Sequence, residues 1–343
     1  MKRPTIADIA RRAGVSTGAV SYALNGQPGV SDATRARILA IAEEIGWRPN
    51  SAARALSAAR VNTVGLAVSR PASVLAIEPF FMQLISGIEA ALSDHGTALL
   101  LQVVPDRAAE VRVHRRWWGE RRVDGVILID LQSDDPRVAP LVEMELPAVV
   151  IGGPSPSPRL TEVYSDEAAA MRTLTDYLAT LGHRHVAHVT GPTDLLHTVT
   201  RNTSFLTAAR RHGFTVAESC ETDYTGEAAA RTTRQLLARP DRPTAVIYDN
   251  DVMAVAAVAV TQEMGLSIPQ DISLVAWEDS PLCQLVHPPL TTLHRDVMAY
   301  GTHAAQQLLA VIEDGERRSY QDETAYLVPR GSTARPRDTA ATA

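Results

Sequence analysis

Residues 5–26, TIADIARRAGVSTGAVSYALNG, contain two short amphipathic segments separated by a glycine. The first begins with the capping-box pair Thr5 and Asp8 and ends at Gly14, with apolar residues at helical spacing between them. Ser16 can cap the second segment, whose apolar residues again lie on one face. The stretch therefore predicts two helices joined by a tight turn.

A third helix is predicted between Ser31 and Gly46, where apolar residues recur three or four positions apart. Three short helices with a tight first turn are typical of a helix-turn-helix domain, whose second helix enters the major groove of DNA. Pro49 and Asn50 then end the third helix and begin an Ala-rich hinge over residues 49–60. A segment this short is not helical alone in water, so we expect it to fold only beside its symmetry mate on DNA.

Charge is unevenly distributed along the 343 residues, whose formal net charge is −6. Residues 1–60 hold nine basic and four acidic side chains, a net charge of +5, which leaves −11 for the rest of the chain. A basic head on an acidic body is expected when one small domain contacts phosphates and the remainder does not.

The chain begins without a signal-peptide pattern and offers no apolar run long enough for a membrane span, so we expect a cytoplasmic protein. Cys220 and Cys283 lack metal-ligand spacing, and we interpret both as ordinary thiols. His183, His185 and His188 form a cluster, but in a strand the last two point to opposite faces, which argues against a metal site.

From Val61 onward, short apolar runs alternate with amphipathic helices. Apolar strands separated by helices indicate parallel sheets covered on both faces, and about 270 residues are too many for one such sheet. We therefore expect two lobes, with a ligand site between them at the carboxyl ends of the strands. The predicted strands are 63–68, 98–104, 125–130, 148–152, 186–190, 245–248 and 273–276, and the predicted helices include 81–94, 168–181 and 251–264.

An ordered series of motifs resembles the LacI/GalR (lactose and galactose repressor) family over nearly the full length. It comprises TIADIARRAGVSTGAVSYALNG, VSDATRARILAIAEEIGWRPN, NSAARAL, NTVGLAV, EPFF, RVDGVIL, LGHRHVAHVTGP, YDNDVMA and HPPLTT. The resemblance implies an all-α helix-turn-helix head, a hinge helix and an α/β core of two Rossmann-like lobes of the periplasmic-binding-protein type with three crossovers. The implied boundaries are 1–48 for the head, 49–60 for the hinge and 61–332 for the core. Lobe 1 would cover about 61–163 plus 295–320, lobe 2 about 164–294 plus 321–332, and 333–343 would be a disordered tail.

The resemblance also assigns DNA-binding residues in the head and hinge. Tyr22 stands where many family members have Arg, and tyrosine cannot make the bidentate contact to guanine that arginine makes, so the operator sequence does not carry over. Leu56 would be the wedge that opens a base step in the minor groove. Thr17, Gly18 and Tyr22 would face the base edges, Thr5, Ser16, Ser21 and Asn25 would cap helices or contact phosphates, and Asn50, Ala53 and Leu56 would enter the minor groove.

In the core, the resemblance implies an effector site whose carboxylates, amides, arginine and aromatic rings suit a polyol. Two motifs depart from the family pattern, since Asn-Pro-Phe-Phe is here Glu-Pro-Phe-Phe (78–81) and Gly-Phe-Asp-Asp is Ala-Trp-Glu-Asp (276–279). The implied effector-binding residues are Phe80, Phe81, Asp166, Arg201, Asn250, Asp251, Trp277 and Glu278.

We therefore predict a dimeric repressor of a pseudo-palindromic double-stranded operator, controlled by a sugar or glycoside, with no cofactor or metal and no membrane partner. Within the same class, a corepressor-type regulator of purine or protein ligands stays open, because the sign of the ligand effect depends on which lobe arrangement it favours. A sugar-transport component would need an export signal and no DNA-reading head. An enzyme is disfavoured because the sequence has no Walker loop, nucleophile elbow or dinucleotide signature.

Overall fold

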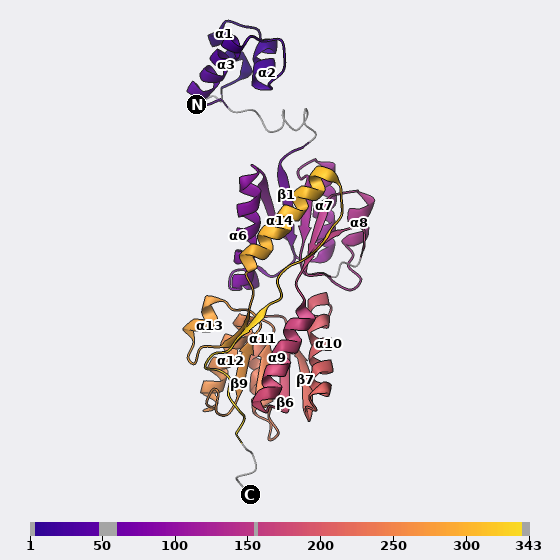
Figure 1. The fold of residues 1–343 in the computed structure, drawn as a ribbon, viewed down its shortest axis with the longest axis vertical. Helices are drawn as coiled ribbons and strands as arrows, with labels where there is room; N and C mark the ends of the chain where they lie inside the picture. The colour runs from indigo at the N-terminus through magenta and orange to yellow at the C-terminus, as the bar shows by residue number, and fades with distance from the viewer. Residues whose placement is uncertain (1–3, 48–59, 154–156, 338–343) are drawn as a thin grey trace. The chain divides into compact units, whose positions relative to one another are not determined.

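The computed structural model describes residues 4–47, 60–153 and 157–337 (Figure 1). Its contacts divide the chain into two compact units, Met1–Val61 and Asn62–Ala343, which are treated separately below. The predicted hinge residues Asn50, Ala53 and Leu56 lie outside the described residues.

The first unit is a three-helix domain made of α1 (Ile6–Ala13), α2 (Thr17–Leu24) and α3 (Asp32–Glu44). Gly14 ends α1 in the left-handed conformation at φ 66°, which a glycine adopts without steric cost. The apolar faces of the three helices meet in a small core: Ile9, Ala10, Ala13, Val20, Ala23, Ile38 and Ala42 are all buried. The three predicted helices are thus observed, although Ile6 and Leu39, at 36% and 47% exposure, lie outside this core.

Two parallel α/β sheets form the second unit, one in each lobe (Figure 1). The first sheet has the order β11-β5-β4-β3-β1-β2, and all its strands are parallel. Its central strands are buried along their whole length, as expected for a sheet with helices on both faces. The strands are β1 (Thr63–Val68), β2 (Ala98–Val103), β3 (Gly125–Leu128), β4 (Ala148–Ile151), β5 (Thr161–Tyr164) and β11 (Ser319–Gln321), and the helices are α5 (Ala72–Leu75), α6 (Pro79–Asp94), α7 (Arg107–Gly119), α8 (Val138–Glu143) and α14 (Val297–Asp314).

The second sheet has the order β12-β10-β9-β8-β6-β7 and is parallel except for its edge strand β12, which runs antiparallel to β10. The strands are β6 (His185–Thr190), β7 (Val216–Glu221), β8 (Ala245–Tyr248), β9 (Ser273–Ala276), β10 (Thr291–His294) and β12 (Tyr326–Val328), and the helices are α9 (Glu167–Leu181), α10 (Leu196–Arg211), α11 (Gly226–Leu237), α12 (Asp251–Glu263) and α13 (Pro281–Leu285).

The chain passes between the two sheets three times, after β5, after β10 and after β11. Three passages agree with the fold implied by the sequence resemblance. Because each passage follows a strand, the loops at the carboxyl ends of both sheets lie next to the passages and line the space between the lobes. Among the described helices, none is long and apolar enough to cross a membrane.

The predicted disorder from residue 333 is wrong for residues 333–337. The buried Ser332 hydroxyl donates to the Leu274 carbonyl at 2.6 Å and accepts from the Thr291 amide at 2.8 Å. Two residues further on, the Ala334 amide donates to Ser273 Oγ at 3.1 Å. These hydrogen bonds tie a polar segment to the amino ends of β9 and β10, so polar composition alone did not reveal that this segment is ordered.

Helices α6 and α14 pack so closely that their backbones touch. Gly87 of α6 lies on the Met298 carbonyl of α14, and Gly301 of α14 lies on the Leu84 carbonyl of α6. A Cβ atom at either glycine would overlap the facing carbonyl group. Since α14 carries the chain back into the first lobe, this contact secures the returning segment to the lobe's own helix.

We predict that Gly87→Ala destabilises the core by roughly 1–3 kcal/mol, because the added methyl group forces two packed backbones apart. Chemical unfolding followed by circular dichroism measures the change. Gly119→Ala is the control, because no atom lies within 4 Å of a Cβ at this helical residue; it should stabilise or be neutral, within about 1 kcal/mol. Equal effects of the two substitutions would contradict the close approach of α6 and α14.

Candidate DNA-binding and effector-binding sites

In the first unit, the residues predicted to bind DNA lie on the exposed side of α2 and at helix ends. Ser16 caps α2 by accepting a hydrogen bond from the Ala19 amide at 3.1 Å, and Asn25 donates to Ser21 Oγ at 3.4 Å. Tyr22 projects from α2 with 51% of its surface exposed, and Thr17 and Gly18 are also exposed. At the start of α1, the Asp8 carboxylate accepts hydrogen bonds from the amide and hydroxyl of exposed Thr5. One turn of α2 is therefore exposed and can enter the major groove of DNA.

Arg35, which the sequence analysis did not assign a role, fixes the end of α2. Its guanidinium donates to the carbonyl oxygens of Ala23 at 3.0 Å and Gln27 at 2.7 Å. A helix end leaves carbonyl groups without partners, and a cation satisfies them. Arg35 therefore holds the recognition helix in place, and its contacts are to the protein itself.

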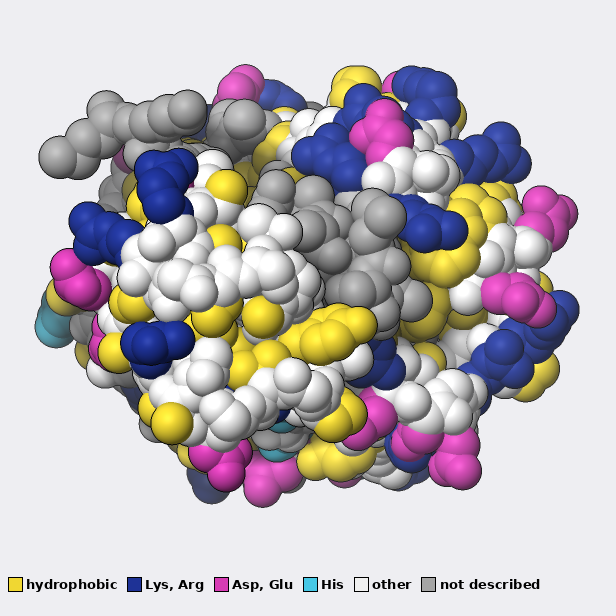
Figure 2. All heavy atoms as spheres, turned by 90° about the horizontal axis from the view of Figure 1, so that it is seen from above, with side chains coloured by type: hydrophobic (Ala, Val, Ile, Leu, Met, Phe, Trp, Pro, Cys, Tyr) yellow, Lys and Arg dark blue, Asp and Glu magenta, His cyan; other side chains and the backbone are white. Residues whose placement is uncertain are grey.

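The basic excess of residues 1–60 does not come from the three helices. Residues 4–47 contain four arginines and four acidic residues, so the excess lies at Lys2, Arg3, Arg48, Arg54 and Arg60. All of these but Arg60 are outside the described residues. On the face drawn in Figure 2, basic side chains are interspersed with apolar and uncharged ones, with no single uniformly basic surface.

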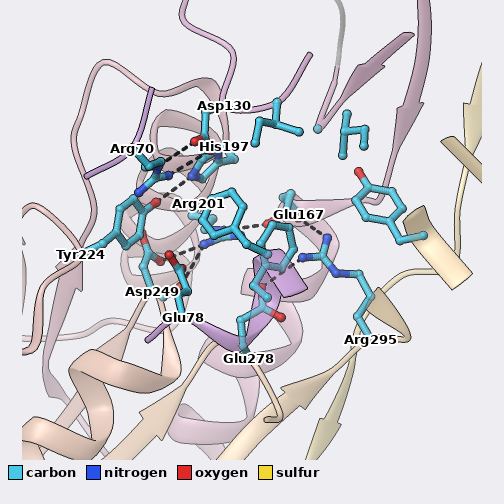
Figure 3. Close-up of a pocket in the computed structure, with 16 residues that line it drawn as sticks. Arg70, Glu78, Asp130, Glu167, His197, Arg201, Tyr224, Asp249, Glu278 and Arg295 are labelled. Carbon is cyan, nitrogen blue, oxygen red and sulfur yellow. Dashed lines mark hydrogen bonds and ion pairs between the residues drawn. The ribbon is translucent and has the colours of Figure 1, made fainter. Parts of the chain in front are cut away.

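In the second unit, a cleft lies between the lobes at the carboxyl ends of their strands (Figure 3). Three arginines and five carboxylates converge on it, together with His197 and four aromatic rings. The charged residues are Arg70, Glu78, Asp130, Glu167, Arg201, Asp249, Glu278 and Arg295, and the rings are Phe80, Phe81, Tyr224 and Tyr300.

On the first lobe, Arg70 and Asp130 form a two-pronged ion pair with N to O distances of 2.7 and 3.0 Å. Burial alone would raise the pKa of Asp130, but the charge and hydrogen bonds of Arg70 lower it below its usual range. The same guanidinium lies 4.6 Å from the centre of the Tyr224 ring, which belongs to the second lobe. Arg70 thus joins the lobes through a cation-π contact.

Asp130 and Tyr224 both have left-handed backbones, with φ of 55° and 67°. Non-glycine residues adopt this region at a cost of about 1 kcal/mol or more, and such residues concentrate at binding sites. The Tyr224 ring covers Gly191, where a Cβ atom would overlap the ring. The backbone therefore places these two side chains in the cleft from the ends of β3 and β7.

On the second lobe, Arg201 is buried and bonded to two carboxylates. Its Nε donates to Glu167 at 2.7 Å, its Nη1 lies 3.6 Å from Asp249, and its guanidinium stacks 4.1 Å from the Trp277 ring. Burial opposes ionisation of Asp249, yet His188 and Arg201 lower its pKa to about 2. Arg201 Nη2 makes no hydrogen bond to the described residues, so one donor remains available for a ligand.

Arg295 connects two carboxylates at the passage from β10 to α14. It donates to Glu167 at 3.2 Å and to Glu278 at 3.1 Å. Its guanidinium also lies 4.9 Å from the Tyr300 ring and 5.7 Å from the Phe80 ring of the first lobe. Burial raises the pKa of Glu278, and the charges of Arg295 and Arg201 limit this rise.

Glu78 differs from the other four carboxylates because it makes no ion pair with any described residue. It is 8% exposed, and its Oε1 accepts one long hydrogen bond, 3.4 Å, from the Asn250 amide. Its Oε2 is buried without a hydrogen-bond partner. Burial raises the pKa of Glu78 to about 7, although the nearby charge of Arg70 favours ionisation.

Four of the eight residues predicted to bind the effector line the cleft: Phe80, Phe81, Arg201 and Glu278. Asp166 is not among the residues that line this cleft: its partly exposed carboxylate caps α9 by accepting from the Ala169 amide, while the next residue, Glu167, faces the cleft. The side chains of Asn250 and Asp251 bond the first amides of α12, and Trp277 lies behind Arg201. These three residues support the cleft lining, and they do not form its surface.

Nine polar or aromatic cleft residues were not predicted from the sequence: Arg70, Glu78, Asp130, Glu167, His197, Tyr224, Asp249, Arg295 and Tyr300. The position of five of them after a strand could have identified them. Each lies within three residues of a strand's carboxyl end: Arg70, Asp130, Tyr224, Asp249 and Arg295. The clustered histidines have partners within the lobe. His183 bonds Thr244 Oγ1 and the Ala334 carbonyl, and His188 bonds Asp249.

Each of the two units is similar to a known protein family. Residues 5–50 match the model described as "Bacterial regulatory proteins, lacI family", and residues 175–333 match the "Periplasmic binding protein-like domain". The HTH-type transcriptional regulator CelR of Thermobifida fusca is 32% identical over 312 residues, which are 90% of this chain and 92% of that protein. The chain belongs to the LacI family of bacterial regulatory proteins.

Further comparisons agree with this assignment. The HTH-type transcriptional repressor PurR of Aliivibrio fischeri (strain ATCC 700601 / ES114) is 30% identical over 92% of this chain and 95% of its own length. The solved "transcriptional regulator CelR-cellobiose complex" is 30% identical with a TM-score of 0.74, covering 96% of this chain and all of that one. A lac repressor dimer bound to operator is 25% identical with a TM-score of 0.85, covering 97% of this chain and all of that one. This LacI-family protein is a DNA-binding transcriptional regulator, not an enzyme.

We predict that Glu78→Gln stabilises the core increasingly as pH rises from about 5 to about 8. The folded pKa of about 7 exceeds that of an unfolded glutamate, so the native state binds the extra proton and wild-type stability falls as pH rises through this window. The gain should approach roughly 1–3 kcal/mol at the upper end. Thermal unfolding of both proteins across the window measures it.

Glu89→Gln is the matched control, because Glu89 lies on the exposed side of α6. Its stability difference from wild type should stay constant with pH. If the stability difference between Glu78→Gln and wild type also stayed constant with pH, the pKa of Glu78 would not be raised in the folded protein.

Proposed function

We propose that this regulator is a repressor that binds a pseudo-palindromic operator as a homodimer in the cytoplasm and releases it when a sugar-like effector occupies the cleft. One observation carries the effector part of the proposal: hydrogen-bonding charged groups and aromatic rings from both lobes converge on one cavity. The proposed DNA contacts are those of Thr17, Gly18 and Tyr22 on α2, with the hinge residues Asn50, Ala53 and Leu56 in the minor groove.

The cleft chemistry favours a polyhydroxylated ligand. Carboxylates such as Glu278 accept from sugar hydroxyls, and the free Nη2 of Arg201 can donate to a ring or hydroxyl oxygen. The Phe80 ring, set edge-on to Phe81 at 5.5 Å between ring centres, offers an apolar face for the carbon side of a pyranose. Cellobiose is the first probe to try, because the related CelR has been solved in complex with it.

The route from cleft to DNA begins at β1, which follows the hinge and ends two residues before Arg70. A ligand that changes the lobe arrangement also changes where β1 begins in each subunit, and hence the spacing of the two hinges. Since a hinge of residues 49–60 is too short to be helical unaided, a small change in spacing is enough to unfold it. A coupling of about 1–3 kcal/mol suffices for release.

We predict that saturating cellobiose weakens operator binding by wild-type protein about tenfold or more, and that Arg201→Lys needs about tenfold more cellobiose for the same response. Lysine keeps a positive charge beside Glu167 and Asp249 but loses the donor fork, which should cost about tenfold in ligand affinity. Operator affinity without ligand should stay within about twofold of wild type, since Arg201 lies in the second lobe. Fluorescence anisotropy with labelled operator at fixed salt measures the operator affinity of wild type and Arg201→Lys, each without cellobiose and over a range of cellobiose concentrations.

Arg201→Ala is a harsher variant, because it leaves two buried carboxylates without their cation. It is informative only if thermal unfolding shows an intact core. A response of Arg201→Lys equal to that of wild type would mean that Arg201 is not the effector anchor. Tighter operator binding with cellobiose would replace the inducer model by a corepressor one.

A further inference from the structure

The charges in the cleft do not balance. Each of the three arginines is already engaged: Arg70 with Asp130, Arg201 with Glu167 and Asp249, and Arg295 with Glu167 and Glu278. Against these three cations stand five carboxylates. An anionic ligand would therefore meet an excess of negative charge, with each guanidinium already paired with a carboxylate, whereas a cationic ligand would reduce the excess.

The unbalanced charge is concentrated at Glu78. This residue occupies the N-cap position of α6, yet its side chain makes no capping hydrogen bond there. It turns instead toward Asn250, whose amide already donates to the Tyr224 carbonyl at 3.2 Å and reaches Glu78 only at 3.4 Å. Oε2 has no partner among the described residues, so the carboxyl lacks the bonds that would stabilise its charge.

No group of the described residues donates a hydrogen bond to Oε2 of Glu78. The positive charge of Arg70 favours ionisation of Glu78, but its Nε and Nη2 are both bonded to Asp130. Asn250 is held in place because its Oδ1 accepts from the Met253 amide at 2.8 Å. Glu78 is also where the motif departs from the family pattern, with a carboxyl in place of an uncharged amide. The partner that completes this site must come with the ligand.

We infer that the effector is an amino sugar whose protonated amine pairs with Glu78, which makes Glu78 the residue that sets ligand specificity. The inference rests on the proposed function, since it concerns the same cleft. A protonated amine supplies both the hydrogen-bond donors and the charge that the Glu78 carboxylate lacks. The sugar ring and its hydroxyls engage the aromatic faces and the paired carboxylates, as they would for any sugar.

The raised pKa of Glu78, about 7, agrees with this role. In the empty cleft the carboxyl is close to half protonated near neutrality, so it need not carry an uncompensated charge. An arriving amine favours the ionised form. Charge-assisted hydrogen bonds are about twice as strong as neutral ones, so an amine is recognised over the hydroxyl that it replaces.

Isothermal titration calorimetry of the full-length protein with matched sugars tests the inference. The pairs are D-glucose with D-glucosamine and kanosamine, D-galactose with D-galactosamine, and cellobiose with the β-linked dimer of glucosamine. N-acetylglucosamine serves as the uncharged derivative of the amine. We expect at least one amino sugar to bind wild type about tenfold or more tighter than its hydroxyl counterpart. Glu78→Gln should remove that preference, and Glu89→Gln should retain it.

Two results would overturn the inference while leaving the proposed function intact: neutral sugars that bind as well as every amino sugar, or an amine preference that survives Glu78→Gln. If no sugar of either kind binds wild type, both the inference and the sugar-responsive function are wrong. Circular dichroism shows whether Glu78→Gln is folded. If the folded variant has lost the preference for amino sugars, the preference depends on the Glu78 carboxylate.

Discussion

Pairing of buried charges between the carboxyl ends of two parallel sheets is the constraint on which the core depends. Glu167 accepts from both Arg201 and Arg295, so one carboxylate at the start of α9 links two otherwise separate guanidinium groups. Leaving any of these groups buried without its partner is costly, often by about 3–5 kcal/mol. The network therefore keeps the cleft side chains of the second lobe in one arrangement, and Arg295 extends it to the Phe80 and Tyr300 rings of the first lobe.

This coupling explains how a ligand can be sensed. Contacts between the lobes run through Arg70 and Tyr224, through Glu78 and Asn250, and through the Leu196 amide, which donates to the Leu131 carbonyl at 2.8 Å. A ligand in the cleft competes with or extends these few contacts. Because β1 follows the hinge along the chain, we propose that a change at its carboxyl end is transmitted to the segment that leads to the DNA-binding head.

The head and the central strands were predictable from the sequence because capping residues and continuous apolar runs mark them. The strands that escaped prediction are β5, β7, β10, β11 and β12. They lie at or near sheet edges and are short or partly polar, as in VAESCE of β7, none of whose residues is buried. Of the thirteen polar and aromatic side chains that line the cleft, four were predicted. Arg201 and Glu278 followed from family motifs, but Asp130 and Arg295 follow from topology, which brings distant strand ends together.

Hydrogen–deuterium exchange of the full-length protein, with and without the sugar that binds most tightly in calorimetry, tests the central claim most directly. The claim is that one ligand contacts both lobes. We predict increased protection of amides in residues 76–84 of the first lobe and in residues 193–202 of the second, together in one titration. Protection confined to one lobe, or found only outside the cleft, would contradict an effector site built from both.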